Sequence, residues 1–141
     1  MKTRMILFAM GLMIMGASMS AQAQLPGPVE KTKMQGPDLI TDGIREMDLN
    51  NGKLEVAVKN IGENASKKSV VRLKITPTDG LKDSLTANVK VLAPGEIVWI
   101  PMSFGKPLNL ANYCAVADAL KQNAETNEKN NEKCGQLSGK P

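Results

Sequence analysis

A cluster of acidic and amide side chains late in the chain is the part of the sequence best suited to chemistry. Its oxygen-bearing members are Asp118, Glu125, Asn127, Glu128 and Asn130. Oxygens of this kind are what Ca²⁺ takes as ligands, six to eight at a time. The spacing fits no EF-hand loop, however, and the glycine that such a loop needs is missing. We favour the alternative that these side chains cap strand ends and bond the amides of their own loop.

Catalysis by this cluster is not expected. Glycoside chemistry needs two carboxyl groups that face each other in unequal environments. Glu125 and Glu128 are expected to lie together on one exposed loop, with nothing nearby to raise a pKa. The chain also contains no histidine, and no Gly-x-Ser-x-Gly turn occurs. The commonest general base and the histidine-activated nucleophiles are therefore missing. We predict a protein that is not an enzyme and that needs no cofactor, with calcium as the alternative.

The only cysteines, Cys114 and Cys134, are the second feature with chemical meaning. An even pair in an oxidising compartment predicts a disulfide. A two-thiolate metal site would lack further soft ligands here, and two free thiols persist poorly outside the cytosol. The pair therefore favours a bridge that closes a ring within the last third of the chain.

The N-terminus predicts export. Lys2 and Arg4 precede an apolar stretch, residues 5–15, that is too short to span a bilayer, and small residues at 21–23 suit a signal peptidase. We predict a signal peptide over residues 1–23 and a periplasmic or secreted product that is not inserted in a membrane. Residues 24–36, rich in proline and glycine, predict a flexible leader. The folded domain is expected over residues 37–137, with a short tail at 138–141.

The charge and the aromatic content argue against a nucleic-acid partner. The formal net charge is +4, but Lys2 and Arg4 of the predicted signal contribute to it. Beyond the signal the aromatic residues are Trp99, Phe104 and Tyr113. Nucleic-acid surfaces combine a basic stripe with aromatic platforms on which bases stack. No such combination is visible in the sequence.

Apolar residues recur with period two after Asp38, which predicts half-buried strands. The clearest alternations lie within residues 53–59, 70–75 and 85–91. Residues 97–104 are apolar on both faces, and Pro101 predicts that this strand bends, ends or lies at an edge. Shorter strands are expected at 113–118 and 134–137. Between them, residues 119–132 predict a long polar connection that could include one helical turn.

Turn-forming residues separate these strands. They occur at 50–52, 62–64, 77–80 and 93–95, where Asn and Gly tolerate the left-handed backbone of tight turns. Short strands at this spacing predict an all-β, two-sheet antiparallel β-sandwich of about seven strands. Trp99 is expected in its core. If Val98, Ile100 and Met102 instead form an exposed apolar strip, that strand becomes a docking surface.

Four segments in order resemble the CARDB family, the cell-adhesion-related immunoglobulin-like domain of bacterial exported proteins. They are residues 37–40, 56–62, 92–96, and 115–118 with the acidic, Asn-rich residues that follow. The resemblance spans nearly all of residues 37–135 and implies an immunoglobulin-like fold. It also implies structural turn roles for five residues: Asn60, Gly62, Pro94, Gly95 and Asn131.

Two features depart from the family pattern. The apolar residue that usually precedes the loop glutamate is Asn123 or Ala124 here, and the cysteine pair is additional. If Asp118 ends one strand and Asn131 begins the next, antiparallel pairing would place Cys114 opposite Cys134 or its neighbour. Residues directly opposite each other on one face are close enough for a disulfide.

These observations predict a recognition or adhesion module. We expect it to contact an envelope or extracellular protein, or a glycan, through its loops or a sheet edge. The alternatives are a calcium-stabilised binding module and a small secreted inhibitor or accessory subunit that inserts a loop into an envelope enzyme.

Overall fold

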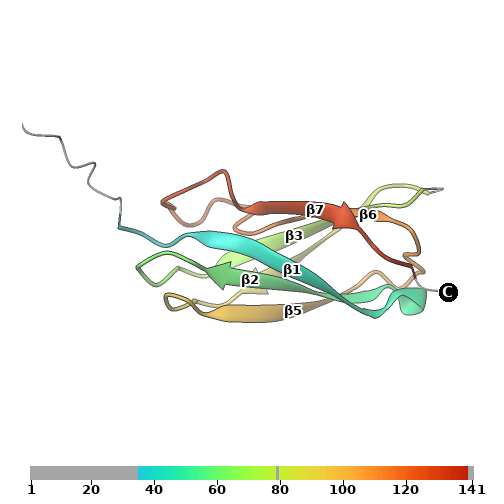
Figure 1. Ribbon diagram of the computed structural model, residues 1–141, viewed down its shortest axis with the longest axis horizontal. Coiled ribbons are helices and arrows are strands. Elements are labelled where there is room, and N and C mark those ends of the chain that lie inside the picture. Colours follow the sequence, from blue (N-terminus) through green and yellow to red (C-terminus); the bar gives the residue numbers. More distant parts are fainter. Residues whose placement is uncertain (1–34, 79, 140–141) are drawn as a thin grey trace, which may run out of the picture. The chain divides into compact units, whose positions relative to one another are not determined.

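A computed structural model describes residues 35–78 and 80–139, and this part of the chain is all-β. The predicted signal peptide and most of the predicted leader lie outside the described residues. Seven strands form two antiparallel sheets that lie face to face (Figure 1). The sandwich predicted from the alternating apolar residues is therefore confirmed.

The first sheet, sheet A, has three strands in the order β1–β2–β5. A short 3-10 helix, η1 (Leu49–Asn51), joins the β1–β2 hairpin. Asp48 caps it by accepting a hydrogen bond from the Asn51 N–H. Gly52 follows with a left-handed φ of 65°, which glycine adopts without strain. The strands of sheet A are β1 (Leu39–Asp48), β2 (Lys53–Asn60) and β5 (Ile97–Ser103).

The second sheet, sheet B, has four strands in the order β4–β3–β6–β7. They are β3 (Ser69–Thr76), β4 (Asp83–Val89), β6 (Asn112–Val116) and β7 (Glu132–Gln136). Burial alternates along β3, so that one face of the strand points to the core and the other to solvent. Val71, Leu73 and Ile75 are fully buried, while Lys74 is exposed. Period-two alternation places one set of side chains on each face of a sheet.

The core lies between the two sheets. Leu54, Val56 and Val58 of β2 belong to one buried apolar cluster with the core-facing residues of β3. Burial of a Val, Leu or Ile side chain contributes roughly 1.5–3 kcal/mol, so this cluster is the main source of stability. The register of β2 with β5 brings Val56 opposite Ile100, which extends the core across sheet A.

Pro101 lies where the sequence predicted, in an edge strand. β5 pairs with β2 on one side and is last in the order of sheet A. An edge strand tolerates a proline because one row of its N–H groups has no ladder to join. Met102 and Ser103 complete the strand beyond it.

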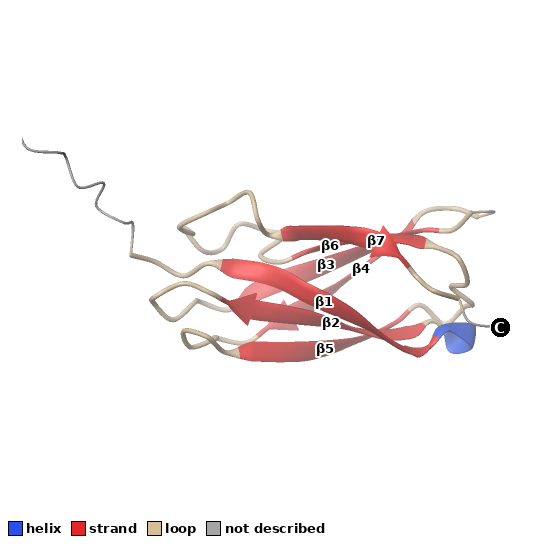
Figure 2. Ribbon diagram, in the orientation of Figure 1, coloured by secondary structure: helices blue, strands red, loops and turns tan. Residues whose placement is uncertain are grey.

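The β6–β7 connection, residues 117–131, contains no helix. Its base is closed by a hydrogen bond of 3.0 Å from the Ala117 N–H to the Asn131 carbonyl. One hydrogen-bonded turn is present, in which the Lys121 N–H donates to the Asp118 carbonyl at 2.8 Å, but it does not continue as a helix. The reason lies in Asp118, whose carboxylate accepts the N–H groups of Gln122 at 2.9 Å and Asn123 at 2.8 Å. Side-chain acceptors of this kind compete with helical hydrogen bonding. Within the described residues η1 is the helical element (Figure 2).

The predicted disulfide is present between Cys114 and Cys134, with an S–S distance of 2.02 Å. The two cysteines are directly opposite each other in the β6–β7 register. The bridge lies on the outer face of sheet B, because the neighbouring Ala115 faces the core and is fully buried.

Candidate functional site

The acidic and amide residues singled out from the sequence lie at one end of the sandwich, here called the polar end. It comprises the start of β1, the β2–β3 and β4–β5 connections, and the loop 117–131. Figure 1 shows these segments together at the end of the sandwich opposite η1. Hydrogen bonds link them: Ser66 N–H donates to the Leu92 carbonyl at 2.9 Å, and Thr126 N–H donates to the Pro37 carbonyl at 3.1 Å.

Asn60 is the centre of one half of the polar end. Its side chain is fully buried at the end of β2. The Oδ1 atom accepts the N–H groups of Asp38 at 3.1 Å and Gly62 at 3.0 Å. The Nδ2 atom donates to the carbonyls of Asn64 at 2.8 Å and Leu92 at 3.0 Å. One amide group therefore satisfies four backbone groups from three segments, which is the most that an Asn side chain can do.

Gly62 and Gly95 allow the chain to fold around Asn60. A Cβ atom at position 62 would lie 2.3 Å from the Gly36 carbonyl oxygen, so only glycine fits there. Gly95 has a left-handed φ of 79° next to the exposed Pro94. Its N–H donates to the Asn60 carbonyl at 2.7 Å. These contacts are compatible with the turn roles that the family resemblance implied.

Glu125 is the centre of the other half. It is only 6% exposed, although it lies in a loop. Its Oε1 atom accepts the Leu39 N–H of β1 at 2.9 Å, and its Oε2 atom accepts a hydrogen bond from the Asn131 amide. The carboxyl group thus ties the loop to a strand 86 positions earlier in the chain. The prediction that this glutamate is exposed, with nothing nearby to raise its pKa, is wrong.

Burial raises the pKa of Glu125 to about 7. Desolvation of the charged carboxylate is the main cause, and the negative charges of Asp118 and Glu128 act in the same direction. The hydrogen bonds from Asn131 and from the Leu39 N–H oppose the shift, because they favour the charged form. The sequence shows both acidic neighbours. It does not show that the loop folds back onto β1 and removes Glu125 from water.

Three polar residues that the sequence analysis did not select complete the polar end. The hydroxyl of Thr41, buried in β1, donates to the carbonyls of Asn131 at 2.9 Å and Ala115 at 3.2 Å. Asp38 accepts hydrogen bonds from Thr126 at 3.0 Å and from Asn130 at 2.9 Å. The buried Ser66 hydroxyl accepts the Leu92 N–H at 3.0 Å. The burial of Thr41 could have been predicted from the sequence, because Thr41 lies two residues after Leu39 and therefore on the same face of the strand.

The acidic members of the proposed calcium site, Asp118, Glu125 and Glu128, do not form a metal-ligand group among the described residues. Asp118 is buried and bonded to its own loop, and Asn127 accepts the Lys129 N–H at 3.1 Å. The exposed Glu128 accepts the Glu125 N–H at 3.1 Å. Asn130 contacts Asp38 through its Nδ2 atom, which is a donor and cannot bind a cation. Oxygens of Asp118, Asn127 and Glu128 are therefore used in hydrogen bonds that stabilise the loop, whereas the buried Asn130 Oδ1 accepts none from the described residues.

One group of three potential metal ligands does converge among the described residues. It consists of Cys114, Glu132 and Cys134, whose ligand atoms lie within 4.8 Å of one another. The two sulfur atoms are joined in the disulfide. Thiolates, not disulfide sulfurs, are the metal ligands of cysteine, so this group does not fit a metal while the bridge is intact.

Trp99 lies on the outer face of sheet A, and the prediction that it belongs to the core is wrong. Small residues explain this placement: Trp99 pairs with Ala57, which pairs in turn with Gly43. Ala57 is fully buried although it is not part of the core cluster. The Arg45 guanidinium lies 3.9 Å from the centroid of the Trp99 ring. A cation covers one ring face, which leaves little free aromatic surface.

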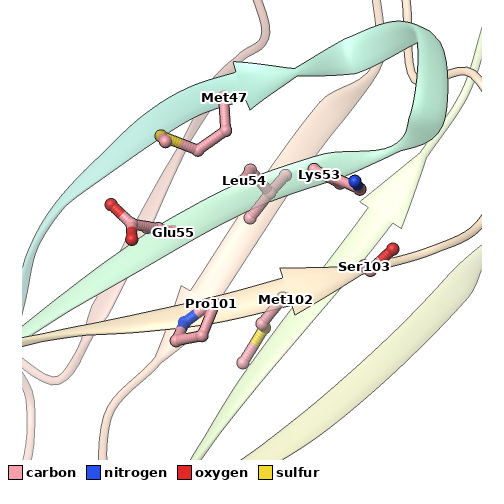
Figure 3. Close-up of a pocket in the computed structure, with 7 residues that line it drawn as sticks. All are labelled: Met47, Lys53, Leu54, Glu55, Pro101, Met102 and Ser103. Carbon is pink, nitrogen blue, oxygen red and sulfur yellow. The ribbon is translucent and has the colours of Figure 1, made fainter.

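The alternative of an exposed strip formed by Val98, Ile100 and Met102 is also wrong, because Ile100 and Met102 are buried core residues. A shallow groove of about 370 Å³ lies on sheet A. Figure 3 shows its lining, which comes from β1, β2 and β5 and consists of Met47, Lys53, Leu54, Glu55, Pro101, Met102 and Ser103.

The outer face of sheet B carries a second groove, of about 530 Å³, at the end nearer the loop 117–131. Its lining combines apolar surface with polar and basic groups and consists of Lys68, Ser69, Val70, Asn88, Val89, Lys90 and Gln122. Lys90 forms an ion pair of 2.7 Å with Glu96 at its rim. Further along the same face lie Arg72 and Lys74 of β3.

Comparison with known proteins places this geometry in context. A sequence model described as CARDB matches residues 36–134. The crystal structure of a CARDB domain from Pyrococcus furiosus, in complex with di-metal ions, is similar to this chain with a TM-score of 0.54. It is 23% identical and covers 76% of this chain and 96% of its own.

Two solution structures are also similar. One is a CARDB domain from Pyrococcus furiosus, with a TM-score of 0.54 and 28% identity, covering 74% of this chain and 96% of its own. The other is a domain of a protein from Methanosarcina acetivorans described as a cell surface protein, with a TM-score of 0.56 and 19% identity. The similarity to the Methanosarcina acetivorans domain covers 74% of this chain and 92% of that domain. No curated protein matches the sequence significantly.

Proposed function

This chain belongs to the CARDB family, and we propose on that basis that it is a non-catalytic recognition module of the adhesion type. Its task would be to bind a protein or a glycan at the bacterial envelope or outside the cell. The observation that best supports this proposal is that the buried carboxyl groups of the acidic loop, Asp118 and Glu125, accept hydrogen bonds from within the domain and so stabilise the fold. The outer faces of the two sheets carry exposed side chains, such as Lys53 and Lys74, that a partner could contact.

Glu125 is the residue that most nearly resembles a catalytic group, because a pKa near 7 suits a general acid or base. A catalytic acid must also reach its substrate. Glu125 is 6% exposed, and both of its oxygens already accept hydrogen bonds from within the domain. Its raised pKa is explained by a structural role, and a structural role is consistent with a family of non-catalytic modules.

Export is part of the proposal. The disulfide between Cys114 and Cys134 is typical of proteins that mature in an oxidising compartment. The N-terminal sequence has the charge and apolar pattern of a secretory signal. In the described residues no helix is long and apolar enough to cross a membrane. We expect a product that begins near Gln24.

Binding of a metal is the second candidate, because the Pyrococcus furiosus domain is in complex with di-metal ions. In this chain a metal site would have to form from Asp118, Glu125 and Glu128, whose oxygens stabilise the loop. Calorimetric titration with Ca²⁺ and Zn²⁺ separates the candidates. Heat of binding with either ion at micromolar affinity would support a metal-dependent module. If no heat of binding is observed, the metal-dependent module is rejected and a recognition module that needs no metal is the remaining candidate.

Affinity capture from native envelope and culture medium tests the main proposal. The tagged protein is the bait, and a variant with charge reversals on both sheet faces is the control. A stoichiometric surface protein or polysaccharide supports recognition. A stoichiometric enzyme would support the inhibitor or accessory-subunit alternative. Turnover of a substrate by the purified protein would contradict the proposal.

A further inference from the structure

The outer face of sheet B has an unusual composition. In β4 the outward positions are Ser84, Thr86 and Asn88, all of them exposed and neutral but able to hydrogen-bond. In the neighbouring β3 the outward positions include Arg72 and Lys74. The register places Arg72 opposite Thr86 and Lys74 opposite Ser84. Each of these two cations in β3 therefore lies directly opposite a hydroxyl-bearing residue in β4.

Three cations on this face, Lys68, Arg72 and Lys74, form no ion pair with a carboxylate in the part of the chain that the structure describes, whereas Lys90 is paired with Glu96. The ion pairs found there are Arg45–Glu55, Lys90–Glu96 and Lys106–Asp83. None of them involves Lys68, Arg72 or Lys74. The register puts one acid on this face near them, Glu132 of the edge strand β7, separated from Arg72 by Val116. The face therefore carries uncompensated positive charge along its central strand.

A groove continues this row of cations. Lys68 and Lys90 line it from two sides, and Asn88 and Gln122 add amide groups. From Lys68 to Lys74 an extended strand covers roughly 20 Å. The surface is therefore long enough to contact several units of a linear polymer that lies along β3.

The chemistry of the face identifies the class of partner. The centres of protein interfaces are rich in apolar and aromatic side chains, whereas this face offers only the partly buried Val70 and Val116 and the disulfide. Single-stranded nucleic acids need aromatic platforms, which its outward positions lack. Carboxylates pair strongly with Arg and Lys, and sugar hydroxyls can exchange hydrogen bonds with Ser, Thr and Asn.

We propose that the outer face of sheet B binds a carboxylated polysaccharide along β3, through Lys68, Arg72 and Lys74 together with the polar groups of β4. This inference rests on the proposed function as a recognition module and names the class of its partner. The groove at Lys68 and Lys90 holds one end of the bound segment.

Two acidic polymers, polygalacturonate and polymannuronate, serve as probes in calorimetric titrations of the protein at low salt. Fully methyl-esterified polygalacturonate has the same sugar backbone without the charge. The test variant is K68Q/K74Q, in which both altered side chains are exposed. The matched control is K53Q/K59Q, which removes the same charge from β2 on the opposite face. R72Q is measured alongside them.

We expect saturable binding to at least one acidic polymer, binding to the ester that is at least ~10-fold weaker, and a loss of at least ~10-fold in K68Q/K74Q. K53Q/K59Q should bind like the wild type. Thermal unfolding of each variant checks that it is folded, and the wild-type affinity should fall as salt increases.

The proposal is overturned if neither acidic polymer binds, if the ester binds equally well, or if both double variants lose the same affinity. Equal binding of polyglutamate would also overturn it, because the face would then select charge and not sugar. These failures differ from a failure of the proposed function. Capture of a protein partner would leave the recognition module intact and reject only the polysaccharide.

Discussion

Glu125 and Asn60 show, at the residue scale, how a polar side chain in a loop becomes part of a fold. Each bonds to backbone groups of segments that are distant in the sequence. Buried polar groups of this kind contribute little net energy when satisfied, but removing one partner leaves the others unpaired at a high cost. Substitution of either residue should therefore change the stability of the domain.

Replacing Glu125 with Gln should remove a pH dependence of stability. The carboxyl pKa is 4.5 in a model compound and about 7 in the folded protein. Between these values the folded state binds more protons than the unfolded state, so stability is highest at and below pH 4.5 and falls as pH rises through 7. The full loss should be on the order of 3 kcal/mol.

Urea unfolding at a series of pH values measures this effect. The chain has no histidine, so no other side chain of ordinary pKa titrates between pH 5 and 8. Wild-type protein should lose stability across that interval, while E125Q should change little. A flat wild-type profile, or an equal slope in both proteins, would show that Glu125 is not the buried acid described here.

Replacing Asn60 with Ala should destabilise the domain strongly. The change leaves four backbone groups of three segments without their partner. We expect a loss of about 3 kcal/mol in the free energy of unfolding. Asn64→Ala is the matched control, because Asn64 is exposed and takes part in this network through its backbone carbonyl. Similar losses in both variants would contradict the role of the Asn60 side chain.

The residue scale is where the sequence was least informative. An Asn-x-Gly pattern predicted a turn at Asn60, but nothing in it indicated four hydrogen bonds or contact with Leu92. The acidic neighbours of Glu125 were visible, yet its carboxyl group is bonded to Leu39, which lies 86 positions earlier in the chain. Contacts between distant residues leave no local periodicity to detect.

At the scale of elements, period-two alternation was a reliable guide, because burial of one face of a strand constrains every second residue. The strands predicted near residues 53–59, 70–75 and 85–91 correspond to β2, β3 and β4. For Trp99 the pattern led to a wrong prediction. Its outward position depends on Ala57 and Gly43 in neighbouring strands, and a single strand pattern cannot show what lies beside it.

The disulfide between β6 and β7 should stabilise the domain mainly by constraining the unfolded chain. It closes a ring across a sequence separation of 20. The chain-entropy account then gives about 3 kcal/mol. Replacing both cysteines with Ala should lower the free energy of unfolding by that order, with β6 and β7 still paired. A double variant as stable as the wild type would show that the bridge contributes nothing.

At the scale of the whole molecule, the domain is a sandwich closed at one end by polar side chains, with outer faces of different composition. Sheet A carries an apolar groove and a Trp99 ring covered by Arg45, and sheet B carries a row of cations. The fold class follows from the alternating pattern. The two faces could be inferred only after the strand order was known, since Ser84, Thr86 and Arg72 become neighbours through pairing.

The fold should not depend on calcium. Most of its candidate ligands accept hydrogen bonds from backbone N–H groups, as Asp118 does from Gln122 and Asn123. Millimolar Ca²⁺ or a chelator should leave the melting temperature unchanged in a thermal scan. A rise of several degrees with Ca²⁺ that the chelator reverses would instead place a metal at the polar end.

The central claim is that the acidic loop maintains the fold and that recognition takes place on the outer face of sheet B. Mapping amide chemical shifts by NMR while polygalacturonate is added tests it most directly. We predict that the shift changes cluster in β3 and β4, around residues 68–74 and 84–90, while amides of 117–121 and 123–131 stay constant. Changes confined to that loop, or centred on Trp99, would contradict the claim.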